Sequence, residues 1–170
     1  PDSDDAFMFY ALATGKLTSD KYQFEVIRED IETLNHLAQK EKYDITALSF
    51  HAYAYVADKY VLTSSGASFA EKNYGPIVVG KRAHELTSVR AHENQKAFTI
   101  AIPGELTTAA LVLKMIAPDI TTIVMPFDQI IDAVLNDEVD TGLLIHEGQL
   151  QYEKFGLKKI LSLIDSWNAL

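Results

Sequence analysis

Residues 98–117 read FTIAIPGELTTAALVLKMIA, and this stretch decides the fold. The apolar run over residues 98–102 predicts a buried strand, and the Pro-Gly pair after it predicts a tight turn. Apolar residues then recur at helical spacing over residues 107–117, until Pro118 ends the pattern. The sequence therefore predicts a strand, a turn and a helix in direct succession.

Strand-like and helix-like segments continue to alternate on both sides of this stretch. Towards the C-terminus we predict strands over residues 121–125, 140–145 and 159–164, helices over 127–136 and 149–155, and no closing helix. Towards the N-terminus we predict helices over residues 6–14, from Asp30 onwards and over 50–58, and strands over 22–28, 43–48, 61–63 and 77–80. Such alternation is typical of an α/β fold with a parallel sheet.

A polar segment divides the chain. Residues 82–97 carry many charged side chains and few large apolar ones. We therefore predict a first α/β lobe over residues 1–81, a connector or hinge over 82–97, and a second α/β lobe over 98–170.

Composition excludes several classes of protein. The chain has 170 residues, of which 48% are hydrophobic and 23% charged, as in ordinary globular proteins. The net charge of −9 argues against a nucleic-acid partner, although helix ends can still bind a small anion. The chain has no cysteine, which excludes disulfides and makes a cytoplasmic location the default. We expect no membrane span, because no apolar run is long enough.

Three positions after predicted strands are candidates for a binding site. In parallel α/β sheets, ligands lie beyond the carboxyl ends of the strands, where loops meet helix N-termini. Ser49, the pair Thr107 and Thr108, and His146 each occupy such a position. A hydroxyl beside the free N–H groups of a helix start suits a carboxylate, but Ser and Thr also serve as simple helix caps.

His146 has two readings as well. It follows the apolar run of residues 142–145, so its imidazole should emerge at the mouth of the sheet, where it could act as a general base. An isolated histidine can equally be a hydrogen-bonded structural residue. The residues alone leave both readings open.

The remaining polar residues indicate less. Asp5 precedes an aromatic helix and could line a cleft, although helix capping and solvation explain it equally well. His36 lies on the exposed side of a helix, His51 lies just inside the helix after Ser49, and the other histidines lie in the polar connector. We predict no metal site, because metal-ligand spacing is missing, and no dinucleotide or phosphate-binding loop, because the glycines lack the required pattern.

Six stretches occur in order along nearly the whole chain. They read PDSDDAFMFYAL (1–12), EDIETLN (29–35), LSFHAYA (48–54), YGP (74–76), PGELTTA (103–109) and GLLIHEG (142–148). Together they resemble the 1,4-dihydroxy-6-naphthoate synthases of the futalosine route to menaquinone.

The resemblance implies a fold like the type II periplasmic solute-binding proteins, with a ligand cleft between two α/β lobes. It implies a lyase that converts cyclic dehypoxanthinyl futalosine into 1,4-dihydroxy-6-naphthoate, with loss of the sugar-derived fragment and without a cofactor. It also implies that His146 is the base and that Ser49, Thr107, Thr108 and Ala109 hold the carboxylated substrate.

Two alternatives remain. Chorismate dehydratase of the same pathway shares the fold, and a non-catalytic binding protein for a small carboxylate would use similar helix ends.

Members of the resembled family also begin with an earlier strand and continue beyond the position of Leu170, which implies a first lobe that is incomplete at both ends. The sequence does not address the oligomeric state.

Overall fold

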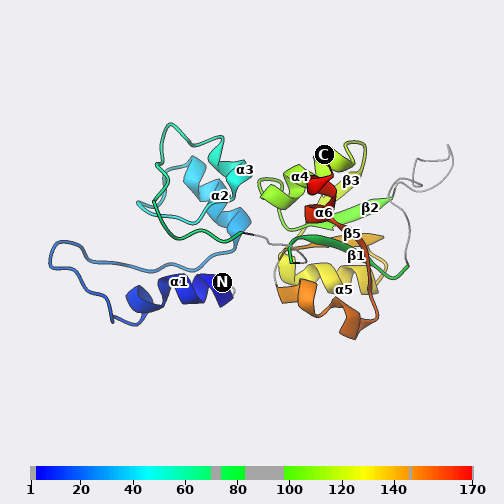
Figure 1. Cartoon of the computed structure of the whole chain (residues 1–170), viewed down its shortest axis with the longest axis horizontal. Helices are drawn as coiled ribbons and strands as arrows, with labels where there is room; N and C mark the ends of the chain where they lie inside the picture. The colour runs from blue at the N-terminus through cyan, green and yellow to red at the C-terminus, as the bar shows by residue number, and fades with distance from the viewer. Residues whose placement is uncertain (1–2, 70–73, 83–97, 146, 170) are drawn as a thin grey trace.

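A computed structural model of the protein describes residues 3–69, 74–82, 98–145 and 147–169. Figure 1 shows three helices joined by long loops on one side and a sheet with its covering helices on the other. The helices of the first part are α1 (Ser3–Ala13), α2 (Ile31–Gln39) and α3 (Phe50–Tyr53). We call residues 3–69 the helical part and the described residues from 74 onwards the sheet part.

The sheet has five strands in the order β3-β2-β4-β1-β5. The strands are β1 (Ile77–Gly80), β2 (Thr99–Ile102), β3 (Thr121–Val124), β4 (Thr141–Leu144) and β5 (Lys158–Ser162). Strand β2 runs parallel to both β3 and β4, whereas β1 runs antiparallel to β4 and β5. The parallel sheet that we predicted is therefore a mixed sheet.

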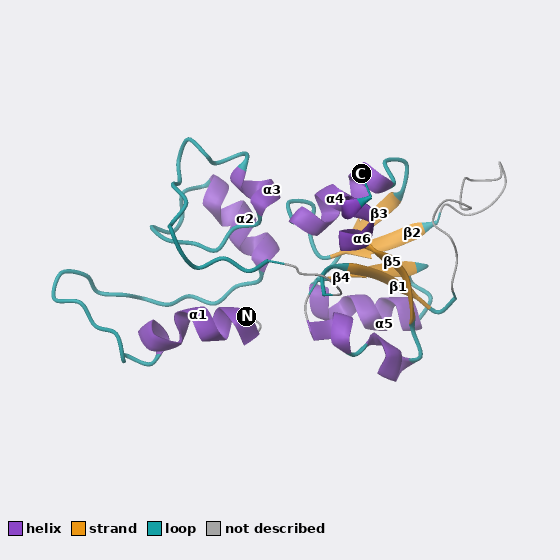
Figure 2. Cartoon of the chain, viewed as in Figure 1, coloured by secondary structure: helices purple, strands orange, loops and turns teal. Residues whose placement is uncertain are grey.

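Helices cover both faces of this sheet (Figure 2). On one face lies α5 (Ile130–Leu135), and on the other lie α4 (Thr108–Ile116) and α6 (Leu163–Asn168). Alternate residues of each central strand serve the two layers. The core on the α5 side includes Ile77, Val79, Ala101, Ile130, Val134 and Leu144, and the core on the α4 side includes Val78, Ile100, Ile102, Leu113, Leu143 and Leu163.

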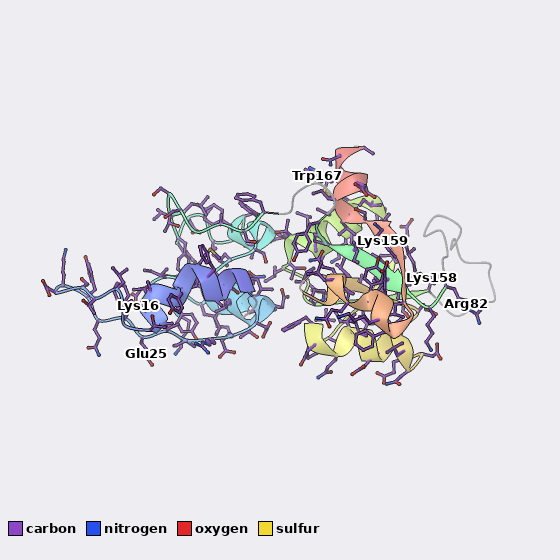
Figure 3. The ribbon with its side chains drawn as sticks, turned by 60° about the horizontal axis from the view of Figure 1, so that its bottom comes forward. Lys16, Glu25, Arg82, Lys158, Lys159 and Trp167 are labelled. Carbon is purple, nitrogen blue, oxygen red and sulfur yellow. The ribbon has the colours of Figure 1, made fainter. Side chains whose placement is uncertain are left out.

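The central strands β1, β2 and β4 are buried at every residue, which explains their continuous apolar runs. Gly142 lies within β4, where a methyl group on it would come 2.3 Å from Cγ2 of Ile130. Only glycine therefore allows α5 to pack this closely. The edge strand β5 begins with Lys158 and Lys159, both labelled in Figure 3. Lysines on an edge strand oppose pairing with other sheets.

Most elements predicted from residue 98 onwards are confirmed with shifted ends. The predicted helix 127–136 begins as the short 3-10 helix η2 (Phe127–Gln129) before α5. The helical stretch at 149–155 is two 3-10 turns, η3 (Glu147–Leu150) and η4 (Tyr152–Phe155). The last predicted strand ends early, and α6 follows it because the Ser162 hydroxyl accepts a hydrogen bond from Asp165 N–H at 3.3 Å. The expectation of no closing helix was wrong.

Three predicted strands of the helical part are wrong. Residues 22–28, 43–48 and 61–63 form no strand, and among residues 3–69 none pairs into a sheet. The side chains of Tyr22, Phe24 and Val26, which made residues 22–28 look like a strand, are exposed. An alternating pattern becomes a strand only where a neighbouring strand accepts its backbone hydrogen bonds.

The expected lobe boundary also differs. We assigned residues 77–80 to the first lobe, but they form β1 within the five-stranded sheet of the second. Pairing with β4 and β5 satisfies the backbone of this fully buried strand on both sides. Of the predicted connector, residues 83–97 lie outside the described residues.

Candidate functional site

Thr107, one of the predicted site residues, is the N-cap of helix α4. The buried Thr107 hydroxyl accepts a hydrogen bond from Ala110 N–H at 3.2 Å and donates one to the Gly104 carbonyl at 2.9 Å. Both bonds serve the backbone, so this hydroxyl caps the helix. The first N–H groups of α4, those of Thr108 and Ala109, have no acceptor within the helix and carry its partial positive charge.

Ser49 occupies the N-cap position of α3, as predicted, but its side chain makes no capping hydrogen bond. It pairs instead with Asn35 of α2. The side-chain Nδ2 of Asn35 donates to the Ser49 hydroxyl at 3.1 Å, and the side-chain Oδ1 of Asn35 accepts from the backbone N–H of Ser49 at 3.0 Å. Because the Ser49 oxygen already accepts this bond, its own O–H is the group left to donate to a ligand.

Asn35 was missed by our reading of the sequence. It is fully buried, at 0% exposure. The signal was available, because Asn35 lies four residues after Ile31 and three before Ala38, on the apolar stripe of α2. A polar residue on such a stripe needs a buried partner, and here that partner is Ser49.

The helical part and the sheet part meet at the start of α4. His51 N–H donates to the Thr108 hydroxyl at 3.3 Å, and the His51 Nδ1 lies 3.3 Å from the Thr107 carbonyl oxygen. Ser49, two residues before His51, is thereby brought close to Thr107 and Thr108. The structure thus brings the segment that carries Ser49 to the helix start at Thr107 and Thr108, although 57 positions separate His51 from Thr108.

A buried carboxylate forms a second junction. Glu32 of α2 is only 8% exposed, and both of its oxygens lie 3.2 Å from Leu106 N–H. Asn35 donates to it at 3.4 Å, and His36 Nε2 lies 3.3 Å away. A methyl group on Gly104 would come 2.2 Å from the Glu32 carboxyl carbon. The Pro-Gly turn before α4 therefore needs its glycine to accept Glu32.

Asp30 fixes the start of α2, which presents Glu32 and Asn35. Its carboxylate accepts from Thr33 N–H at 3.0 Å and from the Thr33 hydroxyl. Partial burial alone would raise the pKa of Asp30, but these bonds and further backbone N–H groups outweigh it and lower the pKa below its usual value. Asp30 is thus the N-cap of α2, and the prediction that a helix begins at Asp30 is confirmed.

A small pocket lies at the carboxyl end of β4. Its volume is about 130 Å³. Its lining is mostly apolar and comprises Phe127, Asp128, Ile131, Leu143, Leu144, Ile145 and Gly148. Strand β4 is parallel to β2, which leads into α4, so the pocket and the α4 start lie at the same edge of the sheet.

The remaining predicted site residues are His146, Ala109 and Asp5. His146 lies outside the described residues, between the pocket-lining Ile145 and Gly148 in sequence. Ala109 is nearly buried in the first turn of α4. Asp5 is half-buried in α1, and within the described ranges no hydrogen bond or ion pair links it to Ser49, Thr107 or Thr108.

Two negative observations apply to the described residues. Within them, no group of three or more His, Asp or Glu side chains is arranged to hold a metal ion. None of the helices described is long and apolar enough to cross a membrane.

Solved structures show the same fold. A crystal structure of a protein from Archaeoglobus fulgidus is 48% identical, with a TM-score of 0.89 over 99% of this chain and 60% of the other. A binding protein component of an ABC phosphonate transporter from Pseudomonas aeruginosa is 17% identical, with a TM-score of 0.61 over 95% of this chain and 61% of the other. The predicted α/β fold of the periplasmic-binding-protein type is confirmed.

Sequence comparisons agree. A protein from Thermus thermophilus is 35% identical over 167 residues, and one from Streptomyces coelicolor is 30% identical over 173. Both are named 1,4-dihydroxy-6-naphthoate synthase, and in each case the match covers 98% of this chain and 58% of the relative. The family that matches residues 1–170 is described as menaquinone biosynthesis. The chain therefore belongs to the menaquinone biosynthesis family.

Proposed function

We propose that the protein carrying this chain is a 1,4-dihydroxy-6-naphthoate synthase, a lyase that converts cyclic dehypoxanthinyl futalosine into 1,4-dihydroxy-6-naphthoate in the cytoplasm. The names of the two relatives support this reaction. The observation that carries it is the junction at which His51, two residues after Ser49 on the helical part, contacts Thr107 and Thr108 at the start of α4. Such a junction suits a small carboxylated substrate.

The substrate carboxylate would lie against the start of α4. The N–H groups of Thr108 and Ala109 supply donors there, and the nine-residue helix behind them favours a negative charge. The Ser49 O–H supplies a donor from the other side. Thr107 contributes by holding the helix start in shape, because its hydroxyl is engaged with the backbone.

His146 would remove a proton from the substrate as a general base. It follows Ile145, which lines the apolar pocket at the sheet edge that also holds the α4 start. The apolar lining would shield the reacting carbon from water, and Asp128 is the ionisable residue of the lining. No cofactor takes part in this proposal.

The helical part and the sheet part would act as two lobes. The His51 contacts already hold the turn of Ser49 at the α4 start, and closure of these lobes would exclude water from the site. The division follows the predicted lobes, residues 1–81 and 98–170 with the connector 82–97, except that β1 counts with the second lobe.

The test is to incubate the protein with cyclic dehypoxanthinyl futalosine and, separately, with chorismate, and to identify products by mass spectrometry. Formation of 1,4-dihydroxy-6-naphthoate from the first substrate supports the proposal. Dehydration of chorismate would identify the sister enzyme instead, and tight binding of either compound without turnover would identify a binding protein.

A variant then tests the base. Replacing His146 by Ala should lower kcat by at least about 100-fold, because general-base catalysis contributes about this much. Turnover by His146→Ala at the wild-type rate would remove His146 from this role.

A further inference from the structure

His51 links the helical part and the sheet part at the proposed site, but it has no role in the mechanism proposed above. Its backbone N–H reaches the Thr108 hydroxyl, and its Nδ1 lies 3.3 Å from the Thr107 carbonyl oxygen. On the other side of the ring, Nε2 lies 3.3 Å from the Tyr55 hydroxyl. The backbone N–H and both ring nitrogens of His51 are therefore engaged.

These contacts select one tautomer of the imidazole. A carbonyl oxygen only accepts hydrogen bonds, so Nδ1 must carry the proton that it shares with Thr107. In the neutral ring Nε2 then has a lone pair, which accepts the O–H of Tyr55. Tyr55 and Thr107 therefore favour the same state, with the proton on Nδ1.

The short helix that carries His51 makes these contacts important. Helix α3 has four residues, too few to be stable or to hold an orientation alone. The two bonds from His51 fix this turn against the start of α4. They also set where Ser49, the N-cap of the same turn, stands relative to the first N–H groups of α4.

We propose that His51, held in its Nδ1–H tautomer by Tyr55, is a positioning residue that aligns Ser49 with the Thr107–Thr108 end of α4 for substrate binding. This inference rests on the proposed function. His51 would act through the Thr107 carbonyl and the Thr108 hydroxyl, without touching the substrate. It gives His51 and Tyr55 a role in the proposed site.

The first test is independent of activity. Nitrogen-15 NMR distinguishes protonated from unprotonated ring nitrogens, and His51→Asn identifies the signals of His51 among the five histidines. For the neutral ring, we expect a protonated Nδ1 and an unprotonated Nε2. In Tyr55→Phe the populations should shift towards the Nε2–H form that free histidine prefers. A wild-type ring protonated on Nε2 would overturn the proposal.

The second test replaces His51 by Asn and by Gln, because the side-chain amide of each can take the place of only one of the two ring nitrogens. The δ nitrogen of Asn can replace Nδ1 as a donor to Thr107, whereas the ε atoms of Gln reach only the position of Nε2. We expect KM for cyclic dehypoxanthinyl futalosine to rise roughly tenfold in His51→Gln, with kcat within about twofold, because one hydrogen bond that orients the site is lost. In His51→Asn, KM should stay within about twofold of wild type, and in Tyr55→Phe it should rise about threefold.

The KM and kcat values of the variants distinguish a positioning role of His51 from a purely structural one. A merely structural role would lower the active fraction, and hence the apparent kcat, with KM unchanged. Equal KM values for His51→Gln and wild type, or equal impairment of His51→Asn and His51→Gln, would overturn the proposal. Absence of turnover by the wild-type protein would instead contradict the proposed function, and the NMR result would then decide whether Tyr55 and Thr107 hold the tautomer.

Discussion

The helical part and the sheet part carry similar apolar patterns, yet they use them differently. In the sheet part, residues such as Ile100, Leu143 and Val78 are fully buried between two helical layers. In the helical part, large apolar side chains face solvent, with Phe7 85% exposed and Val61 90% exposed. The difference teaches that a pattern of apolar residues forms a core only where other elements cover it.

Hydrogen exchange should show the largest contrast between the two parts. We expect the amides of β2 and β4 to exchange only on global unfolding of the 170-residue chain. The free energy of opening should therefore be about 5 kcal/mol or more higher for them than for an amide that is already exposed to solvent. Residues 23–29 make no backbone hydrogen bond among the described residues, so they should exchange almost freely. Mass spectrometry of peptides measures both. Strong protection over residues 23–29 would show that this segment is a paired strand after all.

Two leucines extend the contrast to side chains. Leu143 is 0% exposed in the core and Leu62 is 64% exposed in the helical part. We expect Leu143→Ala to lower the free energy of unfolding by about 3 kcal/mol, because it leaves a cavity, and Leu62→Ala by less than about 0.5 kcal/mol. Urea unfolding followed by circular dichroism tests both. Similar losses for the two variants would contradict the contrast in packing.

A substitution at Gly104 should weaken the junction between the helical part and the sheet part. We expect Gly104→Ala to cost about 2 kcal/mol, because the added methyl group displaces the buried Glu32 carboxylate and its bond to Leu106. Gly148→Ala is the matched control, since its methyl group would meet Ile131 at an ordinary 3.5 Å. If thermal unfolding shows the same midpoint for both variants, Glu32 does not hold this turn.

The smallest effect is expected at the cap of α2. Asp30→Ala should cost about 1 kcal/mol, the usual value of an N-cap, whereas Asp30→Asn should retain most of the cap. The pKa of Asp30 is lowered in the folded protein, so its contribution is present above the ordinary value of 3.8 and is lost as pH falls through the folded pKa. Unfolding measured from pH 6 to pH 2 should show this loss in wild type and not in Asp30→Asn. An identical pH dependence in both would contradict the role of the carboxylate.

The site was predictable in proportion to how local its interactions are. Thr107 was found because a cap needs only the next three residues, and its bond to Ala110 confirms that reasoning. Asn35, Glu32 and His51 were missed or ranked low, because their partners lie in other segments. The partner of Glu32 is the N–H of Leu106, 74 positions away, and no spacing rule reaches that far.

The sequence by itself determined the α/β class, the helix starts at Asp30 and Thr107, and the strands and helices from residue 98 onwards. These depend on hydrogen bonds and apolar periodicity within a few residues. Only the tertiary structure decided that β1 joins the sheet antiparallel between β4 and β5, that residues 22–28 stay unpaired, and that His51 meets the start of α4. Strand pairing and long-range hydrogen bonds depend on which segments come together, and the chain reveals that only when it folds.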